Sequence, residues 1–157
     1  MQKITPYLWF DNNAEEAVNF YLSVFKNSKL VGATRMGGTA AGADGKLMSA
    51  VFQIEGQEFM VLNGGPMFKF SPAISLFVNC ETQAEVDELW EKLSASGSTQ
   101  QCGWLTDKFG ISWQIIPTAL GQLLGDKDPV KSKNVMQAML TMTKIDIAAL
   151  KLAHAAG

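Results

Sequence analysis

The sequence predicts an α+β fold made of two β-α-β-β-β modules and a helical C-terminal extension. The order strand, helix and three strands occurs twice, in residues 4–63 and 73–117, which indicates an internal duplication of roughly 50–60 residues. Beyond these modules the apolar pattern becomes helical, through residues 118–157. The chain has 157 residues, of which 47% are hydrophobic, so it can bury one sizeable core. We therefore expect a single domain over residues 1–157.

The first module begins with the apolar run ITPYLWF at residues 4–10, which predicts a short strand. Asn13 is a candidate N-cap for the next helix, whose first turn is acidic and whose apolar residues recur every three to four positions. Three strands complete the module, at residues 28–36, 47–56 and 57–63. The last two form a hairpin that turns at Glu55 and Gly56, and the glycine- and alanine-rich residues 37–45 form a loop.

The second module repeats this order. Residues 73–79 predict a strand, and Thr82 with Glu85 forms a capping box that opens a helix. A turn is expected at residues 107–110, because Asp107 favours the first position of a turn and a glycine occupies the last. The remaining strands are expected around residues 98–106 and at residues 111–116.

The extension carries a short helical turn, a helix from Val130 to Met142 and a last helix capped by Asp146. One side of the middle helix carries Val135, Met136, Met139 and Met142. This stripe is typical of helices packed over a domain or in a dimer seam, although methionine also suits an adaptable ligand-binding face. Only 18% of the residues are charged, which suggests that another subunit covers some apolar surface. We therefore expect a homodimer.

Composition argues against several classes of function. The net charge is −2 and no Lys/Arg cluster occurs, so no nucleic-acid partner is expected. No segment is long and apolar enough for a membrane span or a signal peptide, which predicts a cytoplasmic protein. Cys80 and Cys102 form no CxxC pair and are expected to be buried free thiols. His154 is the only histidine and is expected to be solvent-exposed, which argues against zinc sites and Ser-His-Asp triads.

Three segments resemble one family. The opening ITPYLWFDNNAEEAVNFYLSVF is similar to the start of the PhnB-like branch, also labelled 3-demethylubiquinone methyltransferase-like, of the vicinal-oxygen-chelate superfamily. CGWLTDKFGISWQIIP, at residues 102–117, matches the second signature of that branch, and VMQAMLTMTKIDIAALKLA matches its helical extension. The run GW-x-x-D-x-x-G-x-x-W-Q is the specific part. The resemblance implies the glyoxalase/bleomycin-resistance fold, a curved mixed sheet around a cup, in a protein that is commonly dimeric.

The resemblance also indicates where a metal would be held. In metal-using relatives, one ligand comes from each of the first, fourth, fifth and eighth strands of the cup. The corresponding positions here are Pro6, Phe59 or Met60, Ala73 and Gln114. These side chains cannot supply the oxygen or imidazole ligands that a divalent ion needs. We therefore expect no metal centre and no cofactor.

Strand alternation predicts which residues line the cup. If Trp113 packs against the helices, Ser112 and Gln114 point into the cup, and Tyr7 and Trp9 pack on the helix side. The expected ligand-binding residues are Leu8, Phe10, Asn63, Ser75, Phe77, Trp104, Ser112 and Gln114. Such an apolar and aromatic pocket suits a small neutral or weakly polar molecule, which Gln114 would orient. The alternative for Gln114 is that its amide only satisfies neighbouring polar groups.

Three functions stay open. The chain is a small-molecule binder, as bleomycin-resistance relatives are, or an enzyme on a small metabolite, or a structural or regulatory dimer with a filled cup. The enzyme would be a lyase, a dioxygenase or the methyltransferase of the family label, with or without a metal. The glycine-rich residues 37–45 precede a predicted strand and not a helix, unlike a nucleotide-binding turn. Glu58 and Asp107 are the carboxylates expected nearest the cup, and no histidine completes an acid–base pair.

Overall fold

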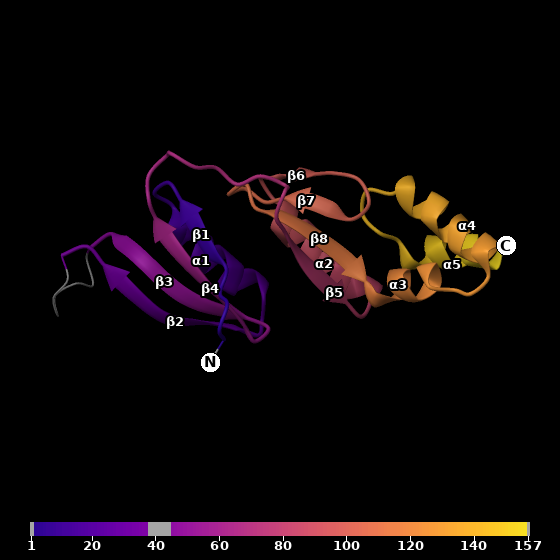
Figure 1. Cartoon of the computed structure of the whole chain (residues 1–157), viewed down its shortest axis with the longest axis horizontal. Helices are drawn as coiled ribbons and strands as arrows, with labels where there is room; N and C mark the ends of the chain where they lie inside the picture. The colour runs from indigo at the N-terminus through magenta and orange to yellow at the C-terminus, as the bar shows by residue number, and fades with distance from the viewer. Residues whose placement is uncertain (1, 38–44, 157) are drawn as a thin grey trace. The chain divides into compact units, whose positions relative to one another are not determined.

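The computed structural model describes residues 2–37 and 45–156. The chain divides into two compact units, Met1–Phe70 and Ser71–Gly157, and each contains one complete module (Figure 1). The expectation of a single domain stays a prediction. Most of the predicted loop at 37–45, namely residues 38–44, lies outside the described residues. No helix in the described part of the chain is long and apolar enough to span a membrane.

The first unit is a four-stranded sheet with one helix. Its elements are β1 (Tyr7–Phe10), α1 (Ala14–Val24), β2 (Ser28–Arg35), β3 (Leu47–Ile54) and β4 (Gln57–Asn63). The strand order is β1-β4-β3-β2, in which β1 and β4 are parallel and the other pairs are antiparallel. Glu55 and Gly56 both have positive φ, 51° and 81°, as the predicted two-residue hairpin turn requires.

The core of this unit lies between α1 and one face of the sheet. Tyr21 of α1 stacks on Phe52 with ring centroids 6.1 Å apart, and Phe52 stacks on its cross-strand partner Phe59 at 5.4 Å. All three side chains are at least 93% buried. Because strand residues alternate between the two faces, these contacts identify which residues of β1, β3 and β4 face α1.

The second unit repeats the plan of the first. Its module contains β5 (Ser75–Cys80), α2 (Gln83–Ser94), β6 (Ser98–Thr99), β7 (Trp104–Thr106) and β8 (Ser112–Pro117). The strand order is β5-β8-β7-β6, with β5 and β8 parallel. The duplication expected from the sequence is thus confirmed. The predicted capping box is present in modified form, because Thr82 Oγ1 accepts from the Glu85 amide while the Glu85 carboxylate accepts from the Glu81 amide.

Three helices complete the second unit: α3 (Thr118–Leu124), α4 (Pro129–Leu140) and α5 (Ile147–Ala155). Their buried side chains form one cluster with the end of β8, made of Ile116, Leu120, Val135, Ile145 and Leu150. Met139 and Met142 pack against this cluster, so these methionines belong to the fold of the unit itself. Met136, by contrast, is 42% exposed.

Two polar contacts hold these helices in place. The Gln83 amide of α2 donates to the carbonyl of Ile145 at 3.0 Å and accepts from the amide of Ile147 at 2.8 Å. His154 Nε2 lies 2.7 Å from Asp126 Oδ2, and both side chains are partly buried. The expectation that His154 is solvent-exposed is therefore wrong, because the packing of α5 brings it to the loop after α3.

Candidate functional site

The β5-β8-β7-β6 sheet has two different faces. On one face, Leu105, Trp113 and Ile115 are at least 98% buried, and α2 covers them (Figure 1). This confirms that Trp113 packs on the helix side. On the other face, Gln114 of β8 lies directly opposite Phe77 of β5 and directly opposite Trp104 of β7. These three residues form a row across the sheet that α2 does not cover.

We call this row, together with Ser75 and Ser112 on the same face, the open face. It is most accessible at Phe77, whereas Ser112 is 98% buried. Phe77 is 54% exposed, whereas Gln114 and Trp104 are half-buried. Two residues beyond Gln114, Ile116 lies on the same face but is buried in the helical cluster. The helices α3 to α5 therefore close one end of the open face and leave the row of three uncovered.

Gln114 is partly engaged with its surroundings. Its Nε2 donates to Ser75 Oγ at 2.9 Å. Within the described part of the chain, neither Gln114 Oε1 nor the indole N–H of Trp104 has a hydrogen-bond partner, and no buried side-chain nitrogen or oxygen is left unpaired. Both groups are therefore open to solvent. The open face therefore offers the Gln114 oxygen as an acceptor, and the indole N–H of Trp104 and the second Nε2 hydrogen of Gln114 as donors.

Asp107, the central residue of the signature, has a structural role. Its side chain is 98% buried, and Oδ1 accepts from the amides of Phe109 and Ile111 at 2.9 and 3.1 Å. Its Oδ2 accepts from the indole N–H of Trp113 at 2.9 Å. The expectation that Asp107 stabilises its turn is confirmed. Because these bonds occupy both oxygens, the carboxylate is not placed to act as a general base.

The glycines of the signature also serve the backbone. Gly110 has φ of 94° and its amide closes the turn on the carbonyl of Asp107 at 3.0 Å. Gly103 has φ of 82°, and a Cβ there would lie 2.7 Å from Cδ1 of Ile116. An alanine at Gly103 would therefore meet both strain and a clash. Trp104 and Gln114 are the two signature residues that lie on the open face.

In the first unit, the expected orientation of the site residues is wrong. Leu8 pairs with Val61, which is fully buried, and alternation places Leu8, Phe10 and Asn63 on the same face as Val61, toward α1. Phe10 is 98% buried and packs edge-on against Phe70 at 5.1 Å. The opposite face carries the residues that were expected on the helix side, Tyr7 and Trp9.

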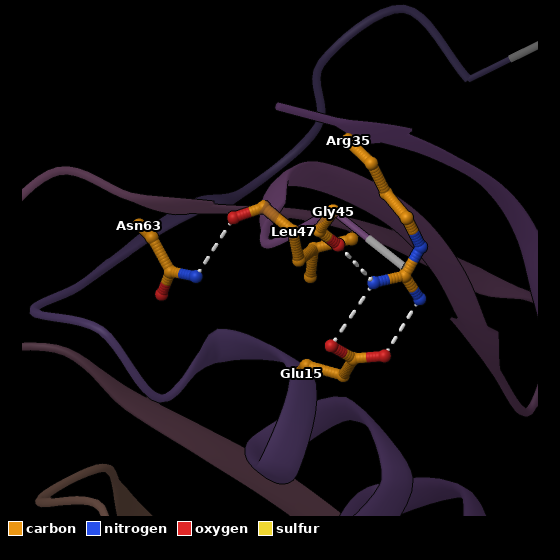
Figure 2. A network of polar contacts seen from close by, with 5 residues as sticks. All are labelled: Glu15, Arg35, Gly45, Leu47 and Asn63. Atoms are coloured by element: carbon orange, nitrogen blue, oxygen red, sulfur yellow. Dashed lines mark hydrogen bonds and ion pairs between the residues drawn. The ribbon is translucent and has the colours of Figure 1, made fainter. Parts of the chain in front are cut away.

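Asn63 is engaged at the start of α1. Its Oδ1 accepts from the amide of Ala14 at 2.9 Å, and its Nδ2 donates to the carbonyl of Leu47 at 2.9 Å (Figure 2). Asn13, the predicted N-cap, makes no side-chain cap bond. The capping function therefore comes from a residue 49 positions along the chain, and no local signal in the sequence identifies it.

A second contact beside Asn63 was not predicted. The guanidinium of Arg35 binds both carboxylate oxygens of Glu15, at 2.6 and 3.1 Å, and donates to the carbonyl of Gly45 at 3.0 Å (Figure 2). The hydrogen bond from Arg35 lowers the pKa of the Glu15 carboxyl, and the same bond raises the pKa of Arg35. The sequence shows the acidic first turn of α1, but it does not indicate that Arg35 on β2 is the partner of Glu15.

The two cysteines differ in environment. Cys80 is fully buried, and this burial, reinforced by the negative charge of Glu85, raises the pKa of its thiol to about 12. Cys102 is half-buried, and its thiol lies 3.7 Å from the carbonyl of Met139. Both are free thiols, as predicted, but the expectation that both are buried holds only for Cys80.

The residues at the four positions implied for a metal do not fit one. Pro6 offers no side-chain ligand, and its carbonyl accepts from the amide of Met60 at 2.9 Å. Phe59 is buried against Phe52. Ala73 has only a methyl group, and Gln114 contributes a single amide oxygen. Among the described residues, no group of three or more His, Cys, Asp or Glu side chains could hold an ion. Glu58, in the first unit, belongs to no such group within the described part of the chain.

Comparison with known proteins gives a consistent result. The family model for 3-demethylubiquinone-9 3-methyltransferase matches residues 2–116. The PhnB protein from Bacillus cereus is 40% identical, with a TM-score of 0.67, over 74% of this chain and 100% of that chain. A Pseudomonas aeruginosa protein is 25% identical, with a TM-score of 0.63, over 74% of this chain and 98% of that chain. No curated protein matches the chain.

The fold is shared more widely. FosX, a fosfomycin resistance protein from Listeria monocytogenes whose structure contains Mn(II) and sulfate, is 16% identical, with a TM-score of 0.51, over 72% of this chain and 90% of that chain. This likeness concerns the fold alone and confirms the glyoxalase/bleomycin-resistance architecture. The family model spans most of the residues, and the Bacillus cereus PhnB protein is matched over its whole length. The chain therefore has the glyoxalase/bleomycin-resistance fold and belongs to the PhnB-like, 3-demethylubiquinone-9 3-methyltransferase family.

Proposed function

We propose that this PhnB-like protein binds a small neutral or weakly polar molecule on the open face, without a metal centre. The observation that carries the proposal is the row Phe77, Gln114 and Trp104, in which an amide with an unpaired oxygen lies between two accessible aromatic side chains. Apolar walls with a few placed polar groups are typical of small-molecule sites. Ser75 supports the site by fixing the Gln114 amide.

The ligand-binding set is smaller than the sequence indicated. We retain Ser75, Phe77, Trp104 and Gln114, because they lie on the open face and are at least partly accessible. Ser112 lies on the same face but is 98% buried, so we leave it out. Leu8, Phe10 and Asn63 are not included, because they face α1 and their groups already pack or bond within the first unit. The metal-free part of the proposal rests on the residues at Pro6, Met60 and Ala73, which offer no hard ligand.

A fragment screen tests this function. A ligand present at about 100 times its dissociation constant stabilises the folded state by about 2.7 kcal/mol, which a thermal shift detects. Gln114→Leu should abolish the shift, whereas Gln122→Leu, a matched change at an exposed position on α3, should preserve it. A shift that survives Gln114→Leu removes Gln114 from the site. A stoichiometric divalent ion in protein purified without added metal would contradict the metal-free part.

We also infer that the protein is a cytoplasmic homodimer. The free thiols Cys80 and Cys102 are consistent with a reducing compartment. Apolar side chains on α4 remain exposed, namely Val130, Met136 and Leu140, each between 42% and 57%. An apolar helix face of this kind suits contact with a second copy. Light scattering after size exclusion tests the dimer, and a monomeric mass at micromolar concentration would contradict it.

A further inference from the structure

The spacing of the open face specifies the shape of its ligand, an inference that rests on the function proposed above. We propose that the ligand carries a planar aromatic ring whose edge presents a hydrogen-bond donor beside an acceptor, as in an aromatic lactam. The first argument is the register. Phe77 and Trp104 lie on the two strands that flank β8, and both are directly opposite Gln114.

This register leaves room for one flat ring. Neighbouring strands are about 4.8 Å apart, so the backbones that carry Phe77 and Trp104 are about 9.6 Å apart across Gln114. With both side chains upright on the sheet, a ring midway between them is about 4.8 Å from each, within the range of about 4.5–7 Å that aromatic pairs favour. A saturated ring is thicker and has no π face, so it gains less from the two walls. A planar aromatic ring inserted edge-first is the shape that would contact both side chains at this spacing.

The Gln114 amide, which lies between Phe77 and Trp104, indicates which polar groups the edge of the ring carries. Gln114 Oε1 has no partner within the described residues, and Nε2 uses one of its two hydrogens on Ser75. The amide therefore presents an acceptor beside a donor. An N–H next to a C=O on the ligand satisfies both groups at once, which leaves no desolvated polar atom unpaired. None of the five open-face residues is charged, so this edge is expected to be neutral.

Three related probes separate the elements of the proposal. 2-Quinolone is planar and has the N–H beside the C=O; 1-methyl-2-quinolone lacks the donor; octahydro-2-quinolone lacks the aromatic ring. Binding is followed by NMR signals of the Trp104 indole N–H and the Gln114 side-chain amide. We expect 2-quinolone to shift both signals, and each of the other two probes to bind about tenfold more weakly.

A pair of variants supplies the protein side of the test. Trp104→Leu removes one wall and should weaken 2-quinolone binding about tenfold, whereas Trp104→Phe keeps a ring and should stay within about threefold of wild type. Because the probe comparison uses wild-type protein, the proposal remains testable if Trp104→Leu does not fold.

The outcomes distinguish this inference from the function on which it rests. Equal binding of the saturated lactam, or of 2-quinolone to folded Trp104→Leu, overturns the aromatic ligand class. The aromatic ligand class is also overturned if 2-quinolone does not bind while other fragments shift the Gln114 signal. In each of these cases the proposed binding of a small molecule on the open face is retained. If no fragment in the screen shifts the Trp104 or Gln114 signals, both the ligand class and the proposed function are wrong.

Discussion

Asp107 accepts a hydrogen bond from the indole N–H of Trp113 at 2.9 Å, and both side chains are 98% buried. The bond joins the turn before β8 to the face of the sheet that α2 covers. Two backbone amides of the turn bind the other carboxylate oxygen. Two residues of the family signature therefore hold each other in place, and neither is available to a ligand on the open face.

The first prediction concerns this carboxylate. Asp107→Ala leaves three donors without a partner, two of them buried, and should lower the free energy of unfolding by about 3 kcal/mol or more. Trp113→Phe removes one of the three bonds and retains most of the packing, so its cost should be about 1–2 kcal/mol. Urea unfolding measures both values. Equal losses for the two variants would show that Asp107 acts only through Trp113.

The second prediction concerns the remote cap of α1. Asn63→Ala removes the acceptor for the Ala14 amide and should cost about 1–2 kcal/mol. Asn13→Ala is the matched control, because Asn13 makes no side-chain cap bond, and it should cost less than about 0.5 kcal/mol. Urea midpoints compare the two. A larger loss in Asn13→Ala would reverse the assignment of the cap.

The third prediction concerns pH. Since the bond to Arg35 lowers the folded-state pKa of Glu15, the folded form releases the proton more readily than the unfolded form. This stabilisation is present above the ordinary pKa of a glutamate and is lost as the pH falls through the lowered value.

Glu15→Gln should therefore be less stable than wild type at pH 7, and the difference should shrink toward pH 3. The Glu15–Arg35 pair is partly exposed, so added salt should also reduce the difference. Urea midpoints at the two pH values measure it, and Glu91→Gln, on the exposed side of α2, is the control. A difference that grows as the pH falls would contradict the role of Glu15.

The fourth prediction separates the two roles of the methionines on α4. Met139 packs against the helical cluster, so Met139→Glu should destabilise the fold by about 2–4 kcal/mol. Met136 is exposed, so Met136→Glu should leave monomer stability within about 0.5 kcal/mol. If α4 forms the seam of the homodimer, Met136→Glu should shift the mass by light scattering from dimer to monomer. An unchanged mass would place the seam elsewhere.

The fifth prediction concerns Cys80. Its burial and raised pKa, about 12, keep it as a protonated thiol at pH 8, and the thiolate is the reactive form. In a Cys102→Ser variant, iodoacetamide should leave the native protein unmodified by mass spectrometry and should add one group after denaturation. Rapid modification of the native variant would show that the core around Cys80 opens.

The sequence was informative where local patterns are decisive. The hairpin at Glu55 and Gly56, the Asp146 cap and the turn at Asp107 follow from residue type at fixed spacing, and the structure confirms them. The side of β8 that carries Gln114 was also predicted correctly, because Trp113 and Ile115 are buried on one face by α2. In these cases the deciding interaction lies within a few residues.

The orientation of β1 could not be derived in the same way. Its residues Tyr7 to Phe10 are all apolar or aromatic. The alternation of side chains therefore does not show which face of the strand is buried. Trp9 is held away from α1 by an edge-on contact with Phe68 and by a bond from its indole to the carbonyl of Gly65 at 2.9 Å. These partners lie more than 50 residues along the chain, and only the pairing of β1 with β4 brings them together.

Most residues of the signature have structural roles, and only Trp104 and Gln114 lie on the open face. This affects what a match to the signature indicates. Four of its six residues, Gly103, Asp107, Gly110 and Trp113, form the turn and the buried hydrogen bonds that hold β7 and β8 of this module. A motif search that scores this run therefore finds proteins with the same local fold. A comparison aimed at the bound molecule would instead examine Phe77 and Trp104, the two residues directly opposite Gln114.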